Sequence, residues 1–363
     1  MNKSKTATKT GRKPTIDDVA AMSGVARVTV SRVLNGGANV REEVRQKVLR
    51  SVEALDYRVN VQARTLAGGG SRLFTLVHPA ADGSEPNSYW ESALELGALH
   101  ACTQHGFHLL TRRVTKDFWH SRDWVLDLVE THRSEGIVLT PPFSDDLELR
   151  EFISDRGCAL VCIAPGRDGR RSVPSIGIDD ELAGYEITKY LIGLGHARFA
   201  FIGGLEGHFA AEQRWDGVMR ALEEAGLGRK AVKSVRGDFS FKSGVDLAPE
   251  LLNGRQAPTA LICSNDDMAV GALFAAHRMG VSVPNDLSIT GFDDTPISAL
   301  IWPPLTTVHQ PIKDMGYRAV DLITEQLKSA KPGATNGFEM LPHEVVVRQS
   351  ADAPRALRRS KTK

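Results

Sequence analysis

The segment GVARVTVSRVLNGG, residues 24–37, decides how the first part of the chain folds. Its apolar residues Val30, Val33 and Leu34 have the spacing of three and four that places side chains on one face of a helix. Beside them stand residues whose side chains donate hydrogen bonds, namely Arg27, Thr29, Ser31 and Arg32. The segment therefore predicts a short helix, from about residue 27 to residue 34, with one buried face and one face of donors.

Helices on either side of this segment would complete a small bundle. Thr15 can cap a helix that ends near Gly24, because Asp18 stands three residues later, as in a capping box. A third helix is predicted from about Val40 by an apolar series on one side, which consists of Val44, Val48, Val52 and Leu55. A helix, a short turn and a second helix with outward-facing donors fit a helix-turn-helix.

The donor face predicts contacts with DNA. The first residues of such a second helix reach base edges in the major groove, so Arg27 and Val28 are the first candidates for base contacts. Arg32 lies near the same face. Arginine can pair with guanine through two hydrogen bonds, and a valine methyl can touch the thymine methyl. Hydroxyl groups more often bind phosphates, which is the role expected of Thr15, Thr29 and Ser31.

The charge along the chain agrees with this prediction. Residues 1–64 hold thirteen Lys and Arg against six Asp and Glu, a net charge of +7 (13 − 6). The whole chain has a formal charge of +1, which leaves about −6 (1 − 7) for the remainder. A basic segment joined to an acidic body is typical of a module that binds a polyanion.

Composition narrows the class of protein. The hydrophobic fraction of 42% is ordinary for a globular protein, and no apolar run approaches the ~18 residues of a membrane span. The N-terminus MNKSKTATKTGRKP has no apolar core of a secretory signal, which predicts a cytoplasmic protein. No CxxC pair occurs, so Cys158, Cys162 and Cys263 are expected to be buried free thiols. Neither a metal nor a cofactor is expected, because a strand near His108 breaks up the group Cys102, His105 and His108.

From Leu73 onward, short apolar runs alternate with stretches of helical length. The runs are LFTLVHP, HLLTRRV, GIVLTPP, ALVCIAP, FAFIGG, ALICSN and LSITGFDD, and the helical stretches include residues 88–105, 117–132, 180–193, 210–226 and 266–280. This alternation predicts parallel sheets with helices on both faces, and its length of roughly 240 residues favours two lobes. Ligands bind at the carboxyl ends of strands in such sheets, so the polar residues 264–266 and 293–294 are candidates for a pocket.

Residues 14–69 resemble the DNA-binding head of the LacI/GalR family of bacterial repressors. The resemblance continues to about residue 350 through VPSIGIDD, LGHARFAFIGG, RWDGVMRALEEAGL, APTALICSNDDMAVGAL, VPNDLSITGFDDTPIS and PPLTTVHQPIKDMGYRAV. It implies a small all-α helix-turn-helix head, joined by a hinge helix to a two-lobed α/β body with parallel sheets, like the periplasmic binding proteins. The expected parts are a disordered basic tail (1–13), the helix-turn-helix domain (14–59), the hinge helix and linker (60–71), an effector-binding and dimerisation domain (72–350) and a basic tail (351–363).

The resemblance also implies roles for particular residues. The hinge helix would place Leu66 as an apolar wedge in the minor groove, with Ala67 beside it. Asn35 and Asn60 are expected at the same DNA interface. The implied effector site contains Arg214 and Asn265 as donors, Asp293 as an acceptor and Phe239 as a stacking ring, whereas Asp293 and Asn265 could instead only cap the turn or helix that follows them. The same site would include Asn87, Ser88, Tyr89 and Trp302, although Trp302 could simply pack.

Three positions depart from the family's pattern. Val59 replaces the proline of the usual YxPN before the hinge, and Ala26 replaces the capping serine of the recognition helix, a loss that costs about 1 kcal/mol. Ala164 stands where many sugar-responsive relatives end the fourth strand with an aspartate, so a carboxylate for sugar hydroxyls is absent there.

The function implied is that of a sequence-specific regulator, a repressor, which binds near-palindromic double-stranded operator DNA as a homodimer. A small effector, a sugar or sugar derivative, would control it, and a nucleobase is the alternative, since arginine and phenylalanine also suit that ligand. A nucleoid-type protein without sequence preference and an α/β enzyme are the competing hypotheses. GGLEG (203–207) follows a predicted strand but lacks the GxGxxG order, and neither GxxxxGK[ST] nor GxSxG occurs.

Overall fold

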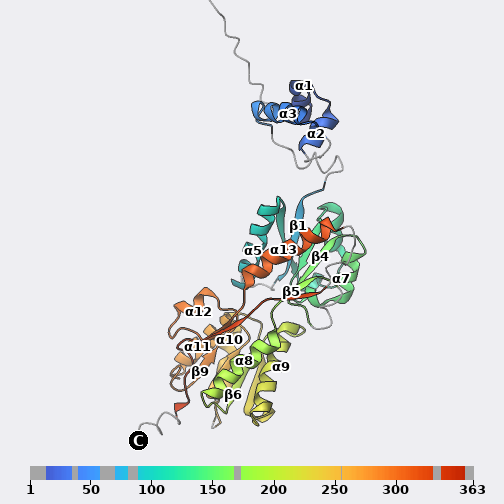
Figure 1. The fold of residues 1–363 in the computed structure, drawn as a ribbon. Helices are drawn as coiled ribbons and strands as arrows, with labels where there is room; N and C mark the ends of the chain where they lie inside the picture. The colour runs from blue at the N-terminus through green and yellow to red at the C-terminus, as the bar shows by residue number, and fades with distance from the viewer. Residues whose placement is uncertain are drawn as a thin grey trace, which may run out of the picture. The chain divides into compact units, whose positions relative to one another are not determined.

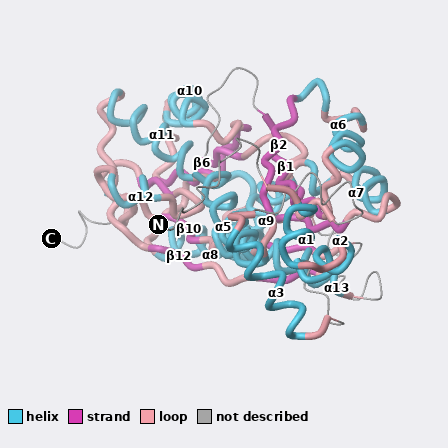
Figure 2. The backbone as a smooth tube through the Cα atoms, turned by 90° about the horizontal axis from the view of Figure 1, so that it is seen from above, coloured by secondary structure: helices cyan, strands magenta, loops and turns pink. Residues whose placement is uncertain are grey.

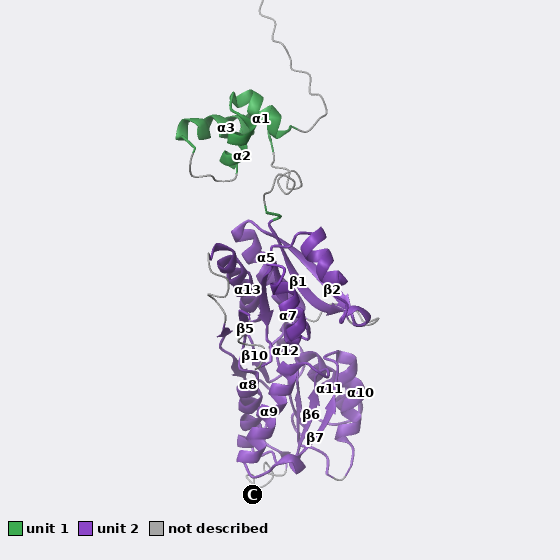
Figure 3. Ribbon diagram, turned by 90° about the vertical axis from the view of Figure 1, so that its right-hand side faces the viewer, with its two compact units in different colours: residues 1–71 green, residues 72–363 purple. Residues whose placement is uncertain are grey.

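The computed structural model describes residues 14–34, 40–57, 70–80, 89–166, 173–254, 256–329 and 337–355. The chain divides into two compact units, Met1–Ser71 and Arg72–Lys363, called the head and the body below (Figure 3). The expected hinge helix, the N-terminal tail and most of the C-terminal tail lie outside the described residues.

The head is a bundle of three short helices, α1 (Ile16–Ser23), α2 (Arg27–Leu34) and α3 (Glu42–Ala54). The predicted capping box at the start of α1 is present, and Gly24 ends that helix with a φ of 64°. The predicted span of α2 is confirmed, whereas α3 begins two residues later than expected. One small core holds the three helices together, and its buried members are Val19, Val30, Val33 and Val48.

The first lobe of the body is built on a parallel sheet with the strand order β11-β5-β4-β3-β1-β2. Its strands are β1 (Leu73–Ala80), β2 (His108–Thr115), β3 (Gly136–Leu139), β4 (Ala159–Ile163), β5 (Ser175–Gly177) and β11 (Phe338–Met340). Along β3, Val138 packs in the core with α5 (Tyr89–His105) and α13 (Ile312–Lys328), whereas Ile137 and Leu139 pack with α6 (Asp123–Leu126) and α7 (Leu147–Ser154). Figure 1 shows α13 beside α5, although the two lie far apart in the sequence.

The second lobe has a smaller parallel sheet with the order β7-β6-β8-β9. Its strands are β6 (Phe199–Gly203), β7 (Val232–Arg236), β8 (Ala260–Cys263) and β9 (Ser288–Thr290). Helices α8 (Asp180–Gly193) and α9 (Phe209–Glu224) share one core with this sheet, and α10 (Phe241–Leu252) and α11 (Asp266–Arg278) share another (Figures 1 and 2). The short helix α12 (Pro296–Leu300) follows β9, and β10 (Thr307–His309) pairs antiparallel with β12 (Glu344–Val346).

This architecture confirms the predicted two-lobed α/β fold, and the free, buried state predicted for Cys158, Cys162 and Cys263 is also confirmed. The single helix predicted over 117–132 is wrong. A 3₁₀ turn (Lys116–Phe118), α6 and a π-helical turn (Asp127–Thr131) occupy that stretch. Between the 3₁₀ turn and α6, the hydroxyl of Ser121 accepts from the backbone N–H of Asp123 at 3.2 Å. Such a local bond competes with helical hydrogen bonds, which apolar spacing does not report.

Helices α8 and α9 approach each other closely at two glycines. A Cβ atom at Gly184 of α8 would overlap the backbone of Arg214, and one at Gly217 of α9 would overlap the backbone of Glu181. Only glycine permits this spacing, because no side chain fits between the two backbones. The contact brings Arg214 against α8, whose residue Asp180 lies one turn before Gly184.

Candidate functional site

Helix α2 buries one face and exposes the other. Val30 is fully buried and Val33 nearly so, whereas Val28 is 64% exposed on the opposite side. Arg27 and Arg32 are exposed together with Val28. The predicted donor face of α2 is therefore available to DNA without any rearrangement of the head's core.

Two of the residues predicted to contact DNA have partners inside the head. The Nε of Arg27 lies 3.6 Å from the carboxylate of Asp17, and both side chains are about two-thirds exposed. Such an ion pair contributes little, so Arg27 can exchange it for a base. The hydroxyl of Thr15 donates to Asp18 at 2.7 Å within the capping box, so a phosphate bond from Thr15 would compete with the cap of α1.

The start of α2 lacks a side-chain cap. The carbonyl of Ala26 accepts from the backbone N–H groups of Thr29 and Val30 at 2.8 and 3.0 Å, as an N-cap residue does, but its methyl group cannot accept a hydrogen bond. Thr29 and Ser31 are half-buried beside the exposed face. The remaining predicted DNA contacts lie outside the described residues: Asn35, Asn60, Leu66 and Ala67.

In the second lobe, Arg214 is buried and held in one orientation. Its Nε donates to the carboxylate of Asp180 at 2.9 Å, and its Nη1 donates to the carbonyl of Ser264 at 2.6 Å. The guanidinium also lies 3.7 Å from the centre of the Phe292 ring. These bonds use two of the five N–H donors of an arginine, so the group keeps donors for a ligand.

Asp293 follows β9 and is 6% exposed. Its carboxylate accepts from Nε2 of Gln310 at 2.5 Å, and its backbone adopts a φ of 104°. Burial raises the pKa of Asp293 well above its usual value, although the positive charge of Arg214 opposes the shift. A buried carboxyl on a strained backbone beside an arginine is typical of a functional site.

Asn265 links the start of α11 to the backbone of Phe239. Asn265 caps α11 by accepting from the N–H of Met268 at 3.0 Å, and its Nδ2 donates to the carbonyl of Phe239 at 2.8 Å. The helix-capping role that the sequence left open is thus present. Phe239 has a φ of 68°, and its ring lies so close to the backbone of Gly204 that a Cβ there would overlap it.

Sequence reasoning missed three residues of this group. Asp180 accepts a hydrogen bond from Arg214, and Gln310 donates one to Asp293. No local motif marks Asp180 or Gln310, because the residue that each one binds lies far away along the chain. His208 caps α9, and the centre of its ring lies 4.8 Å from that of Phe239. Burial, with help from Arg214, lowers the pKa of His208 to about 3, so this ring stays neutral.

The structure places the other predicted effector residues differently. Tyr89 is half-buried at the start of α5 in the first lobe, and Trp302 is 76% exposed. Ala164 directly follows β4 and has a φ of 44°. Asn87 and Ser88 lie outside the described residues. The structure therefore gathers Arg214, Phe239, Asn265 and Asp293 at the carboxyl ends of the second sheet, and it does not bring Trp302 into that buried group.

Two family models match the chain. Residues 15–60 match "Bacterial regulatory proteins, lacI family", and residues 188–351 match "Periplasmic binding protein-like domain". The HTH-type transcriptional regulator DegA of Bacillus subtilis (strain 168) is 34% identical over 350 residues, which span 93% of this chain and 98% of that protein. The chain belongs to the LacI family.

Solved structures are similar to this LacI-family chain over nearly its full length. The Lac repressor dimer bound to operator and the anti-inducer ONPF matches with a TM-score of 0.81 at 26% identity, over 94% of this chain and 100% of that one. The transcriptional regulator CelR in complex with cellobiose matches with a TM-score of 0.66 at 27% identity, over 93% and 100%. The chain is therefore a DNA-binding transcriptional regulator, and the enzyme hypothesis is excluded.

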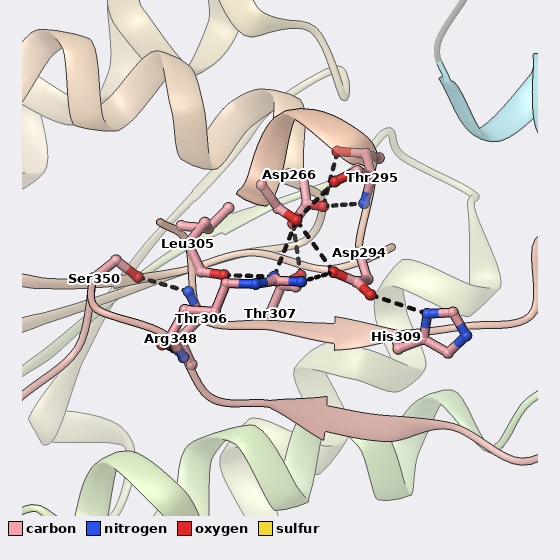
Figure 4. Close-up of polar contacts among 10 residues, drawn as sticks. Asp266, Asp294, Thr295, Leu305, Thr306, Thr307, His309, Arg348 and Ser350 are labelled. Carbon is pink, nitrogen blue, oxygen red and sulfur yellow. Dashed lines mark hydrogen bonds and ion pairs between the residues drawn. The ribbon is translucent and has the colours of Figure 1, made fainter. Parts of the chain in front are cut away.

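A second buried polar group supports the strand ends of this LacI-family regulator (Figure 4). The carboxylate of Asp266 accepts from the backbone N–H of Thr295 at 2.7 Å and from its hydroxyl at 3.0 Å. It also accepts from the hydroxyl of Thr307 at 2.6 Å. Asp266 thus ties the start of α11 to the segment before α12 and to β10.

Asp294, the residue after Asp293, forms contacts with three other segments (Figure 4). Its carboxylate accepts from Nη2 of Arg348 at 2.6 Å and from the hydroxyl of Ser298 at 3.1 Å, and it lies 3.1 Å from Nδ1 of His309. Because these partners come from α12, β10 and the segment after β12, the backbone at Asp293 is fixed from several sides.

Asp266 makes the stability of this LacI-family body depend on pH. Burial raises the pKa of Asp266 to about 7, so folding takes up a proton between the usual aspartate value and pH 7. Stability from this group is therefore lost as pH rises towards 7. The side chain of Asp266→Asn stays neutral, so that loss should disappear in the variant. Between pH 5.5 and 7.0, the free energy of unfolding of the variant should therefore rise by about 2 kcal/mol relative to that of the wild type. Urea unfolding at both pH values measures this difference, and an unchanged difference would refute the assignment.

Within the described ranges, no group of three or more His, Cys, Asp or Glu side chains could hold a metal ion. The described helices of this LacI-family chain also include none that is long and apolar enough to span a lipid bilayer.

Proposed function

We propose that this LacI-family chain is a repressor that binds a near-palindromic operator as a homodimer and changes its operator affinity when a small effector binds in the body. The observation that carries the proposal is the pairing of two features in one chain. One is an exposed donor face on α2 over a separate small core, and the other is a group at strand ends that consists of the buried Arg214 and Asp293 and the half-buried Phe239. Because a bacterial operator lies in the cytoplasm, that is the compartment proposed.

On the DNA side, we assign direct base contacts to Arg27, Val28 and Arg32, and phosphate contacts to Thr29 and Ser31. The exposed side chains of the first three lie where a recognition helix meets the major groove. The start of α2 supports a coupling to DNA, because the side chain of Ala26 cannot accept from its first backbone N–H groups and phosphate oxygens can. The minor-groove role of Leu66 and Ala67, and the contacts of Asn35 and Asn60, remain part of this proposal.

Arg32→Ala tests the operator contact. If Arg32 pairs with a base, the variant should lose about 1–3 kcal/mol on the operator and tolerate changes at one base pair. Fluorescence anisotropy with a set of single-substitution duplexes measures both effects. Arg50→Ala, which removes an exposed arginine of α3, is the matched control and should weaken all duplexes by a similar factor. An equal loss on every duplex for Arg32→Ala as well would mean that it touches only phosphate.

On the effector side, we propose a sugar or sugar derivative. An aspartate that accepts, an arginine that donates and an aromatic ring together suit a polyhydroxyl ring, and the similar regulator CelR is named in complex with cellobiose. The absence of a carboxylate at Ala164 and the neutral His208 beside Phe239 also allow a nucleobase, which remains the second candidate. A thermal-shift screen of mono- and disaccharides, sugar acids and nucleobases separates the two, since a ligand at about 100 times its Kd adds about 2.7 kcal/mol.

For the homodimer, an apolar surface on the second lobe supplies the contact we propose. Leu300 and Trp302 are 79% and 76% exposed around the end of α12. Helix α12 packs on α11, where the exposed ring of Phe274 lies 6.0 Å from that of Phe241. Large exposed apolar side chains such as these are typical of interaction sites. We therefore assign Trp302 to this surface rather than to the effector site.

A further inference from the structure

A carboxyl group of the first lobe lies beside the second lobe. Asp145 ends the 3₁₀ turn Phe143–Asp145 after β3, and its Oδ1 accepts from the backbone N–H of Gly166 at 2.7 Å. Its Oδ2 is buried and has no hydrogen-bond partner among the described residues. Gly166 follows β4 by three residues, so this carboxyl stands near the carboxyl end of that strand.

The first turn of α9, in the second lobe, faces this carboxyl group. The backbone N–H of Phe209 and the carboxylate of Glu212 are both close enough to affect the ionisation of Asp145. The two lobes also touch here, because a Cβ atom at Gly166 would lie 3.0 Å from Cβ and Cγ of Phe209. Carboxyl groups on opposite lobes thus lie close enough for one to affect the ionisation of the other, next to the contact between Gly166 and Phe209.

We propose that Asp145 is a positioning residue of the body: it sets the spacing of the two lobes at the Gly166–Phe209 contact, and it favours the closed spacing when its carboxyl group is protonated. Lobe spacing is a property of the chain whether or not a sugar binds, so the proposal goes beyond effector binding. Its consequence for the effector is indirect, because a ligand that needs the closed spacing binds more weakly when that spacing is less populated.

The direction of the pH effect follows from the groups around Asp145. Burial, together with like-charge repulsion from Glu212 of α9, raises the pKa of Asp145 to about 6. The N–H groups of Gly166 and Phe209 and the guanidinium of Arg150 on α7 oppose the rise. Separating the lobes would let water reach the carboxyl and would remove the charge of Glu212, and both changes lower its pKa towards the usual value. Because burial is the largest cause of the raised pKa, these changes outweigh the loss of the opposing N–H of Phe209. Closure therefore takes up a proton, and it becomes more favourable as pH falls.

Pulsed electron–electron double resonance on the full-length chain tests the proposal. Nitroxide labels at Glu148→Cys on α7 and Glu223→Cys on α9 report the distance between the lobes from exposed helical positions. The four native cysteines are buried, so the introduced pair is labelled selectively. Between pH 8 and pH 5, the ratio of short to long distances should rise about tenfold in the labelled parent.

Variants make the result specific to Asp145. Asp145→Asn should give the short distance at both pH values, and Glu212→Gln should raise the short fraction at pH 8. Gly166→Ala should lengthen the distance at both pH values, because its methyl group meets Phe209, and adding Phe209→Ala should reverse that effect. The proposal is overturned if the parent's distances do not change with pH. It is equally overturned if the pH response persists in Asp145→Asn, or if Glu212→Gln, which keeps Asp145 intact, leaves the distances unaltered.

Discussion

Deletion of residues 1–71 should abolish operator binding while the remaining body still folds and binds its effector. The exposed donors Arg27 and Arg32 stand on α2, and the small core of the head is independent of the body's cores. The body that remains carries the acidic excess of the chain, so it has no electrostatic attraction to DNA. Since specific binding exceeds non-specific binding by at least about 10³-fold, the loss should reach the detection limit.

Anisotropy with a labelled operator measures the binding, and circular dichroism together with a ligand-induced thermal shift shows that the body is intact. As a control, Arg50→Ala in the full chain leaves the head folded and should reduce affinity only modestly, because it removes one charge. Retention of operator affinity by residues 72–363 would place the DNA-binding surface in the body and contradict the assignment of α2.

Replacement of Asp293 should remove the response to effector and leave operator binding unchanged. Asp293 offers the buried acceptor, Gln310 donates a hydrogen bond to it, and Arg214 supplies a positive charge nearby. Coupling between two sites is usually worth 5–150-fold in affinity, so the wild type should show a change in that range, and Asp293→Ala should show almost none. Operator titrations with and without the ligand found in the thermal-shift screen provide both numbers.

The backbone at Asp293 requires a second variant. Its φ of 104° strains most side chains, but asparagine tolerates positive φ better than alanine does. Asp293→Asn should therefore lose the response with less loss of stability than Asp293→Ala. Asp216→Ala, on the exposed side of α9, is the matched control and should respond normally. A normal response in Asp293→Asn would move the effector site elsewhere.

Local signals made the head predictable from sequence. Thr15 and Asp18 form the capping box that their spacing predicts, and Gly24 ends α1 in the left-handed region. The buried positions Val30 and Val33 follow the helical period, because each helix of the small bundle packs one face against a single core. In the body, the apolar runs that became β1, β3, β4, β6 and β8 were predictable because both faces of those strands are covered.

Long-range contacts could not be predicted in the same way. The strands β5, β10, β11 and β12 are only three residues long, and each forms because a distant segment pairs with it. The partners Asp180 and Gln310 are likewise fixed by packing of separate elements, which no spacing in the sequence reveals. The role of a single residue can also stay open in the sequence. An asparagine at position 265 can contact a ligand or cap a helix, and only the structure shows that it caps α11.

Operator binding is tested most directly by titration of the full-length chain onto duplexes taken from the DNA around its own gene. Each is measured beside a scrambled duplex, at fixed salt, with and without the ligand from the thermal-shift screen. We expect one near-palindromic duplex to bind at least about 10³-fold more tightly than the scrambled one, and the ligand to change this affinity by about 5–150-fold. Equal binding to every duplex, unaffected by the ligand, would contradict this expectation and favour a nucleoid-type protein.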